Sequence, residues 1–248
     1  MKKVLKILLG FIGLIIAVGF VSYLVFNESE PQGDRPEEAD QLAQKMMAAV
    51  NKPAWDTTHY VQWTFKGMHD FVWDKQRHLV KVSWEDMEVL VDLKTVKGQA
   101  YKNGQALAGA ENEAMVKEAW KFFCNDSFWL NAVVKAFDPG TERSLVDLPN
   151  GQTALKVHYG QGGVTPGDAY LWMLDETGLP SSWKMWVEII PVGGLEFSWE
   201  KWETLSTGAK IATFHTSKVL DLDISNLKGG TTAQAIGIQG DIFKALMQ

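Results

Sequence analysis

Hydrophobic residues open the chain in one uninterrupted run. Twenty residues without a charge extend from Ile7 to Phe26, and a helix of that length spans about 30 Å, the thickness of a bilayer core. Lysines precede this run at positions 2, 3 and 6, and acidic residues follow it at positions 28, 30 and 34. This charge pattern predicts that residues 1–26 are an uncleaved anchor. Through residues 7–26 it would cross the inner (cytoplasmic) membrane once, leaving the C-terminal part in the periplasm or outside.

A cleaved signal peptide is the alternative for this segment. Ala17-Val18-Gly19 has the small residues of a cleavage site after a short apolar core, and cleavage there would secrete the protein to the periplasm. Phe20 to Phe26 continues the apolar run past that site, which favours the anchor. Both alternatives export the rest of the chain.

Polar residues separate the apolar run from a predicted helix. Residues 27–36 contain Ser, Pro, Gly and acidic side chains, which is typical of a linker. Apolar residues then recur at helical spacing from Ala39 to Val50, with Asp34 as the expected N-cap residue. Residues 37–248 are long enough to form one exported domain with a single core.

The period of the apolar positions changes to two after Trp55. Val61, Trp63 and Phe65 lie on one face of a strand whose other face is more polar. Short runs of the same kind, joined by tight turns, predict an antiparallel meander. The five expected strands lie near residues 59–66, 71–73, 80–84, 89–93 and 98–101.

Helical spacing returns in the middle of the chain, and strands follow it. We expect a helix from Glu111 to Phe123, a break at Asn125-Asp126-Ser127, and a second short helix ending before Pro139. Six further strands are expected near residues 143–148, 153–159, 168–174, 182–190, 195–203 and 210–220, before a terminal helix near 242–247. This order predicts an α+β fold: a long curved antiparallel sheet, or half-barrel, of about 10–11 strands with helices covering its concave side.

Charge, cysteine content and motifs exclude several classes of protein. The formal net charge is −6, which argues against a nucleic-acid partner. The single cysteine, Cys124, excludes an internal disulfide and a cysteine-built zinc site, and its apolar neighbours predict a buried, inert thiol. The chain has no nucleophile elbow, phosphate loop or dinucleotide-binding glycine pattern. We therefore expect neither an enzyme nor a cofactor.

Three histidines are the candidates for metal binding or acid–base chemistry. His59, His69 and His78 lie on or beside neighbouring predicted strands, with several carboxylates nearby. Their spacing fits no compact ligand motif. We therefore expect solvated or strand-edge histidines, no metal site and no catalytic residue.

The order and spacing of the elements resemble those of the LolA/LolB-like lipoprotein-carrier superfamily. The segments His59-Tyr60-Val61-Gln62-Trp63-Thr64-Phe65 and Lys81-Val82-Ser83-Trp84 fall where that family has its first strands. The resemblance covers residues 37–222 and has no diagnostic motif, so it transfers no functional residue. It implies a half-barrel with an apolar cavity that accepts acyl chains or similar ligands. An uncharacterised bacterial family that shares only this fold is the alternative.

Aromatic residues are the candidates for lining such a cavity. The chain has 11 tryptophans in 248 residues, and ten aromatic side chains of the predicted strands mostly share the parity of the apolar positions. They can line a concave apolar cavity or fill a packed core between the sheet and the helices. Trp186 and Trp202 have the opposite parity, which predicts an exterior contact patch. The ten candidates are Trp63, Phe65, Phe71, Trp73, Trp84, Tyr170, Trp172, Trp183, Phe197 and Trp199.

Two functions follow from these observations. The first is a membrane-tethered extracytoplasmic domain that binds an apolar small molecule or a lipid, such as a lipoprotein acyl chain, without catalysis. The second is a structural or protein-interaction module with a packed aromatic core and an exterior contact patch, whose protein partner the sequence does not identify.

Overall fold

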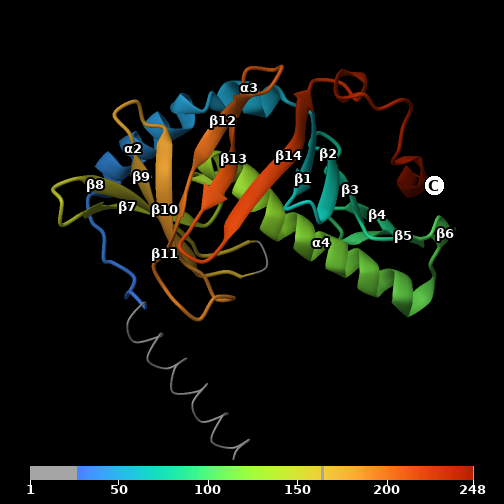
Figure 1. Ribbon diagram of the computed structural model, residues 1–248, viewed down its shortest axis with the longest axis horizontal. Coiled ribbons are helices and arrows are strands. Elements are labelled where there is room, and N and C mark those ends of the chain that lie inside the picture. Colours follow the sequence, from blue (N-terminus) through green and yellow to red (C-terminus); the bar gives the residue numbers. More distant parts are fainter. Residues whose placement is uncertain (1–26, 163–164, 248) are drawn as a thin grey trace, which may run out of the picture.

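The computed structural model describes residues 27–162 and 165–247 (Figure 1). Within these residues the protein is an α+β domain with large antiparallel sheets and few helices, which confirms the expected fold class at this level. The α-helices are α2 (Pro36–Ala49), α3 (Lys52–Thr57) and α4 (Gly109–Asn131). Single 3-10 turns follow at Ala132–Lys135, Gln234–Ile236 and Lys244–Met247.

The larger sheet has nine strands in the order β12-β13-β14-β1-β2-β3-β4-β5-β6. Strands β1 to β5, which come first along the chain, form the meander that the alternating pattern predicts. The strands of this sheet are β1 (Tyr60–Phe65), β2 (His69–Asp74), β3 (Leu79–Trp84), β4 (Met87–Asp92), β5 (Lys97–Lys102), β6 (Gln105–Ala106), β12 (Glu200–Thr204), β13 (Lys210–Thr216) and β14 (Asp221–Gly230).

The smaller sheet has five strands in the order β11-β10-β9-β8-β7. Helix α2 packs on β7 and β8 and buries Ala39, Ala43 and Met46. The strands of this sheet are β7 (Thr141–Asp147), β8 (Thr153–Tyr159), β9 (Asp168–Leu174), β10 (Pro180–Trp186) and β11 (Leu195–Ser198).

One bent strand connects the two sheets. Strand β11 pairs with β10 and strand β12 pairs with β13, and only Trp199 separates β11 from β12. Trp199 is buried, and its backbone nitrogen donates a hydrogen bond to the carbonyl oxygen of Ser181 at 2.8 Å. The single long sheet expected from the sequence is therefore divided at this residue, and the chain turns there from one sheet into the other.

Strand β14 is absent from the sequence-based expectation. The pattern predicts a last strand over residues 210–220, whereas the structure has a turn after Thr216 and a further strand from Asp221. Polar residues and the Gly229-Gly230 pair obscure the alternation of β14. Its conformation is fixed by pairing with β1, where Phe65 lies opposite Ile224. This pairing connects the meander to the second half of the chain.

Helix α4 crosses between the sheets and packs on β3, β4, β5 and β13 (Figure 1). The expected break at Asn125-Asp126-Ser127 is wrong, because the helix continues to Asn131. Asp and Asn disfavour helix interiors when their side chains compete for backbone groups. Here the buried carboxylate of Asp126 is held by Nδ1 of His69 at 2.7 Å, so it does not interrupt the helix.

Residues 27–34, where the sequence predicts a linker, lie along the smaller sheet. The backbone nitrogen of Glu28 donates to the carbonyl of Gly193 at 2.9 Å, and the indole nitrogen of Trp186 donates to the carbonyl of Glu28 at 2.8 Å. Asp34 forms an antiparallel bridge with Leu145. The N-cap residue of α2 is consequently Arg35 and not the expected Asp34.

The predicted membrane segment, residues 1–26, and the alternative cleavage site within it lie outside the described residues. None of the helices in residues 27–162 and 165–247 combines the length and the apolar character that crossing a bilayer requires.

Candidate ligand-binding site

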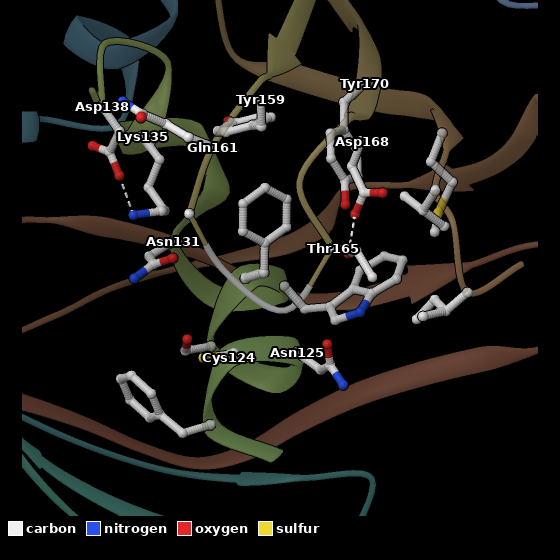
Figure 2. Close-up of a pocket in the computed structure, with 18 of the residues that line it drawn as sticks. Cys124, Asn125, Asn131, Lys135, Asp138, Tyr159, Gln161, Thr165, Asp168 and Tyr170 are labelled. Atoms are coloured by element: carbon white, nitrogen blue, oxygen red, sulfur yellow. Dashed lines mark hydrogen bonds and ion pairs between the residues drawn. The ribbon is translucent and has the colours of Figure 1, made fainter. Parts of the chain in front are cut away.

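A cavity of about 640 Å³ lies between the C-terminal half of α4 and strands β8, β9 and β10. Figure 2 shows Cys124, Asn125 and Asn131 on the helix side of this cavity and Tyr159 and Tyr170 on the strand side. Gln161 and Thr165 come from the connection between β8 and β9. The volume lies within the roughly 300–1,000 Å³ that is usual for small-molecule sites.

Phe128 of α4 forms the centre of an aromatic wall. Its ring is 5.4 Å from the ring of Tyr159, 5.0 Å from that of Tyr170 and 5.9 Å from that of Trp183. Met185 adds a flexible thioether to the same lining. The wall therefore offers broad apolar contacts from one helix and three adjacent strands.

Four buried polar atoms on the cavity lining have no hydrogen-bond partner. They are the hydroxyl of Tyr159, the side-chain oxygen Oδ1 of Asn131, and the indole nitrogens of Trp73 and Trp183. Burial raises the pKa values of Tyr159 and Tyr170 well above their usual range, so both phenols are protonated at neutral pH. Because unpaired buried polar atoms are unfavourable, these four are suited to bonding a polar group of a ligand or a water.

Charged groups also line the cavity, and they have partners. Lys135 forms an ion pair with Asp138, drawn as a dashed line in Figure 2. Thr165 donates a hydrogen bond of 2.6 Å to Asp168, whose pKa is raised mainly by partial burial. Among the described residues that line the cavity, Lys135 is the one cation.

Cys124 lies on the cavity lining and does not have the character of a reactive thiol. It is half-buried, and burial raises the pKa of its thiol to about 11. The thiolate population at neutral pH is therefore very small. This agrees with the inert thiol expected from its apolar sequence neighbours.

The structure divides the ten aromatic candidates into two groups. Trp73, Tyr170 and Trp183 line the cavity. The other seven belong to the aromatic core that fills the space between the sheets and α4, where Trp63 stacks on Phe71 at 4.5 Å. Those seven are Trp63, Phe65, Phe71, Trp84, Trp172, Phe197 and Trp199.

Sequence reasoning did not select several residues that define the site. Phe128 and Asn131 follow the expected break at residues 125–127, in the stretch where a separate short helix was predicted, and Tyr159 is the last residue of β8. Tyr159 shares the strand parity of Leu155 and Val157, which are buried, so the alternation along this strand could have indicated that it faces inward. The position of Asn131 had no comparable signal, because it follows from the continuity of α4.

The three histidines of the first strands do not come together. Phe65 pairs with His69 at one end of β1, whereas Tyr60, next to His59, pairs with Asp74 at the other end. His78 lies in the turn between β2 and β3, away from His69. The described residues contain no group of three or more His, Cys, Asp or Glu that could hold a metal ion.

His69 instead forms a buried pair with Asp126 of α4. Their side chains are 14% and 9% exposed, and the ring of Phe122 stacks on His69 at 4.1 Å. Burial raises the pKa of Asp126 to about 6, although the hydrogen bond and the charge of His69 act in the opposite direction. The pair connects α4 to β2.

The two tryptophans expected on the exterior are both partly covered. Residue 28 lies over Trp186 through the hydrogen bond described above, and Trp202 stacks on the buried Trp199 with ring centroids 6.0 Å apart. Neither forms a freely exposed aromatic surface within the described structure.

The chain was compared with family models, curated proteins and solved structures, and matches were found among the solved structures. A scan against family models and a search of curated proteins found no match. Among solved structures, the chain is similar to a DUF1329 family protein from Desulfovibrio piger, with 13% sequence identity and a TM-score of 0.43 over 87% of this chain and 100% of that chain. At this level the similarity assigns neither a family nor a function.

Proposed function

We propose that this protein is a membrane-tethered extracytoplasmic domain that binds an apolar ligand, such as a lipid or a lipoprotein acyl chain, without catalysis. In this proposal residues 7–26 anchor the chain, and the two sheets joined at Trp199 act as one half-barrel around α4. The observation that carries the proposal is the cavity of about 640 Å³ and its aromatic wall.

Apolar contact by itself is sufficient to hold such a ligand. Burying a methylene group contributes about 0.8 kcal/mol, so an acyl chain gains affinity from the area of the wall more than from specific polar groups. A site of this kind needs no conserved arrangement of charged residues. This is consistent with a sequence that has an aromatic excess and no catalytic motif.

The polar atoms of the cavity favour a ligand with an uncharged polar group. The hydroxyl of Tyr159 and Oδ1 of Asn131 can bond a hydroxyl, ester or amide. A free carboxylate is less well matched, because the one cation among the described lining residues, Lys135, is already paired with Asp138. A neutral glyceride or an acylated amide fits this set of donors and acceptors.

Native mass spectrometry tests ligand binding directly. Residues 27–248, produced in bacteria and purified without detergent, are expected to carry extra mass that disappears on solvent extraction. The identity of the extracted compound gives the ligand class. An apo mass together with no displacement of a fluorescent fatty-acyl probe contradicts the proposal.

Tyr159→Phe tests the polar end of the site. Removing the hydroxyl is expected to weaken binding of the neutral ligand about fivefold, which corresponds to one hydrogen bond of about 1 kcal/mol. Tyr101→Phe is the matched control, because Tyr101 lies on β5 outside the cavity lining. Equal affinity of the two variants would show that the hydroxyl does not contact the ligand.

A protein-interaction module is the second candidate, and one observation favours it. Seven of the ten aromatic candidates pack in the core and not on the cavity. If the protein is apo in the experiment above, this function takes precedence. Trp186 and Trp202 are each partly exposed, and Trp186→Ser with Trp202→Ser should then weaken capture of the partner while the circular dichroism spectrum is unchanged.

A further inference from the structure

Exposed apolar side chains gather on turns at one end of the molecule. The described residues include six large hydrophobic side chains that are exposed, and four of them occupy three hairpin turns. Met68 (60% exposed) lies between β1 and β2, Ile189 (63%) between β10 and β11, and Val219 (76%) with Leu220 (43%) between β13 and β14. We call these four residues the apolar rim.

The strand pairing places the three turns at the same end. The backbone nitrogen of Lys66 donates to the carbonyl of Asp223 at 2.9 Å, so the β1–β2 turn adjoins the start of β14. The backbone nitrogen of Thr216 donates to the hydroxyl of Ser198 at 3.0 Å, so the end of β13 lies beside β11. Strand β11 runs antiparallel to β13 through the bend, and the β10–β11 turn therefore points the same way.

The chain enters the described structure at this end. Asn27 directly follows the uncharged run of residues 7–26, and its side-chain oxygen accepts a hydrogen bond from the backbone nitrogen of Gly193 at 2.8 Å. Gly193 belongs to the same turn as Ile189. Figure 1 shows the first described residues, in blue, beside this turn at the lower edge of the coloured ribbon. Because Asn27 is already bonded to the turn that carries Ile189, the described chain has no unattached spacer between residue 27 and the apolar rim.

The mouth of the cavity opens at the same end. Gly162 and Thr165, from the connection between β8 and β9, contribute to the cavity lining, and so does Ile189 of the rim. Lys66 and Lys218 lie within two residues of rim side chains in two of the three turns, whereas the exposed carboxylates Glu188 and Asp221 adjoin Ile189 and Leu220. The surface is thus apolar with mixed charge around it, which suits the boundary between lipid headgroups and acyl chains.

We propose that the apolar rim rests on a phospholipid bilayer, with Lys66 and Lys218 at the level of the headgroup phosphates. This rests on the proposed function, because residues 7–26 hold the rim at the membrane. In this position the cavity mouth faces the bilayer, and an apolar ligand moves between membrane and cavity without crossing water. Exposed apolar residues on three separate turns serve this contact, since all three turns lie at the same end.

Site-specific fluorescence on the full chain tests the placement of the rim. A nitrobenzoxadiazole label is attached to cysteine in Val219→Cys or Ile189→Cys, and the proteins are reconstituted in vesicles of phosphatidylethanolamine and phosphatidylglycerol. Glu176→Cys is the matched control, because Glu176 is exposed in the β9–β10 turn at the opposite end. Unsubstituted protein gives the blank for Cys124.

Labels on the rim are expected to show a blue-shifted emission and to lose intensity with spin-labelled lipids, whereas the label at position 176 responds only to aqueous iodide. Rim labels as accessible to iodide as the control would overturn the proposal. Rim labels shielded from iodide but not quenched by lipid would also overturn it, since a protein would then cover the rim.

Ligand binding is measured separately on the same proteins by displacement of a fluorescent acyl probe. If the labels lie in lipid and the probe does not bind, the cavity function fails and the docking stands. If the probe binds and the labels are in water, the docking fails and the cavity function stands.

Discussion

For a single residue, burial determines the protonation state, which the residue type alone does not fix. His215 has no exposed surface and lies against the rings of Trp129 and Trp199, at 5.2 Å and 4.5 Å. Its Nδ1 is 3.1 Å from the carbonyl oxygen of Ser198, to which the neutral ring donates. Burial lowers the pKa of His215 to about 4. The folded protein therefore holds a neutral imidazole where the unfolded chain titrates normally.

This predicts a loss of stability on acidification. Because the folded-state pKa is below the unfolded value, the unfolded chain takes up a proton first as the pH falls from about 6.5 to about 4. The free energy of unfolding should decrease by roughly 3 kcal/mol over this window. Urea unfolding at several pH values measures the decrease, and His215→Gln should show a smaller slope. Equal slopes for the two proteins would contradict the assignment.

At the scale of elements, α4 shows how a tertiary contact overrides a local signal. Residues 125–127 have the composition of a helix end, yet the helix continues because Asp126 is paired with His69 and Ser127 is buried. Continuation brings Phe128 and Asn131 to the cavity. The site therefore depends on one helix reaching from β5 to the smaller sheet.

Removing His69 should weaken this arrangement. His69→Ala leaves the carboxylate of Asp126 buried without its partner, and the expected loss is about 3 kcal/mol in the free energy of unfolding at pH 7. Lys52→Ala is the control, because the Lys52–Asp56 pair is largely exposed and such pairs contribute about 0.5 kcal/mol. Chemical denaturation measures both. A loss no larger than that of the control would show that the buried pair does not hold α4.

At the scale of the whole molecule, the bend at Trp199 makes the two sheets dependent on each other. The residue is 2% exposed and packs against Trp172 and Trp183, both at 5.0 Å. A core shared by both sheets favours one cooperative unfolding transition.

Hydrogen exchange can test this coupling. Amides of β2 in the larger sheet and β9 in the smaller sheet should lose protection at the same denaturant concentration. Trp199→Ala is expected to decrease the free energy of unfolding by about 3–5 kcal/mol and to separate the two transitions. Trp120→Ala, on a partly exposed position of α4, should leave them coincident. Separate transitions in the unsubstituted protein would show independent sheets.

The sequence predicted the fold class more completely than it predicted the residues of the site. Alternation in the first strands predicted the meander because each strand buries one face, and the spacing of Ala39, Ala43 and Met46 predicted α2 for the same reason. Parity selected Trp73, Tyr170 and Trp183 together with seven residues that fill the core. Parity gives the face of a strand, whereas a cavity depends on where the opposing helix leaves space.

The α+β class, a helix in the middle of the chain and the aromatic excess could be predicted from the sequence, because local periodicity and composition do not depend on long-range contacts. Long-range contacts were needed to establish the register that separates His59 from His69, the pairing that forms β14, and the continuity of α4. They also brought the three apolar turns and the cavity mouth to one end. These features depend on contacts between residues far apart in the chain, which no local pattern records.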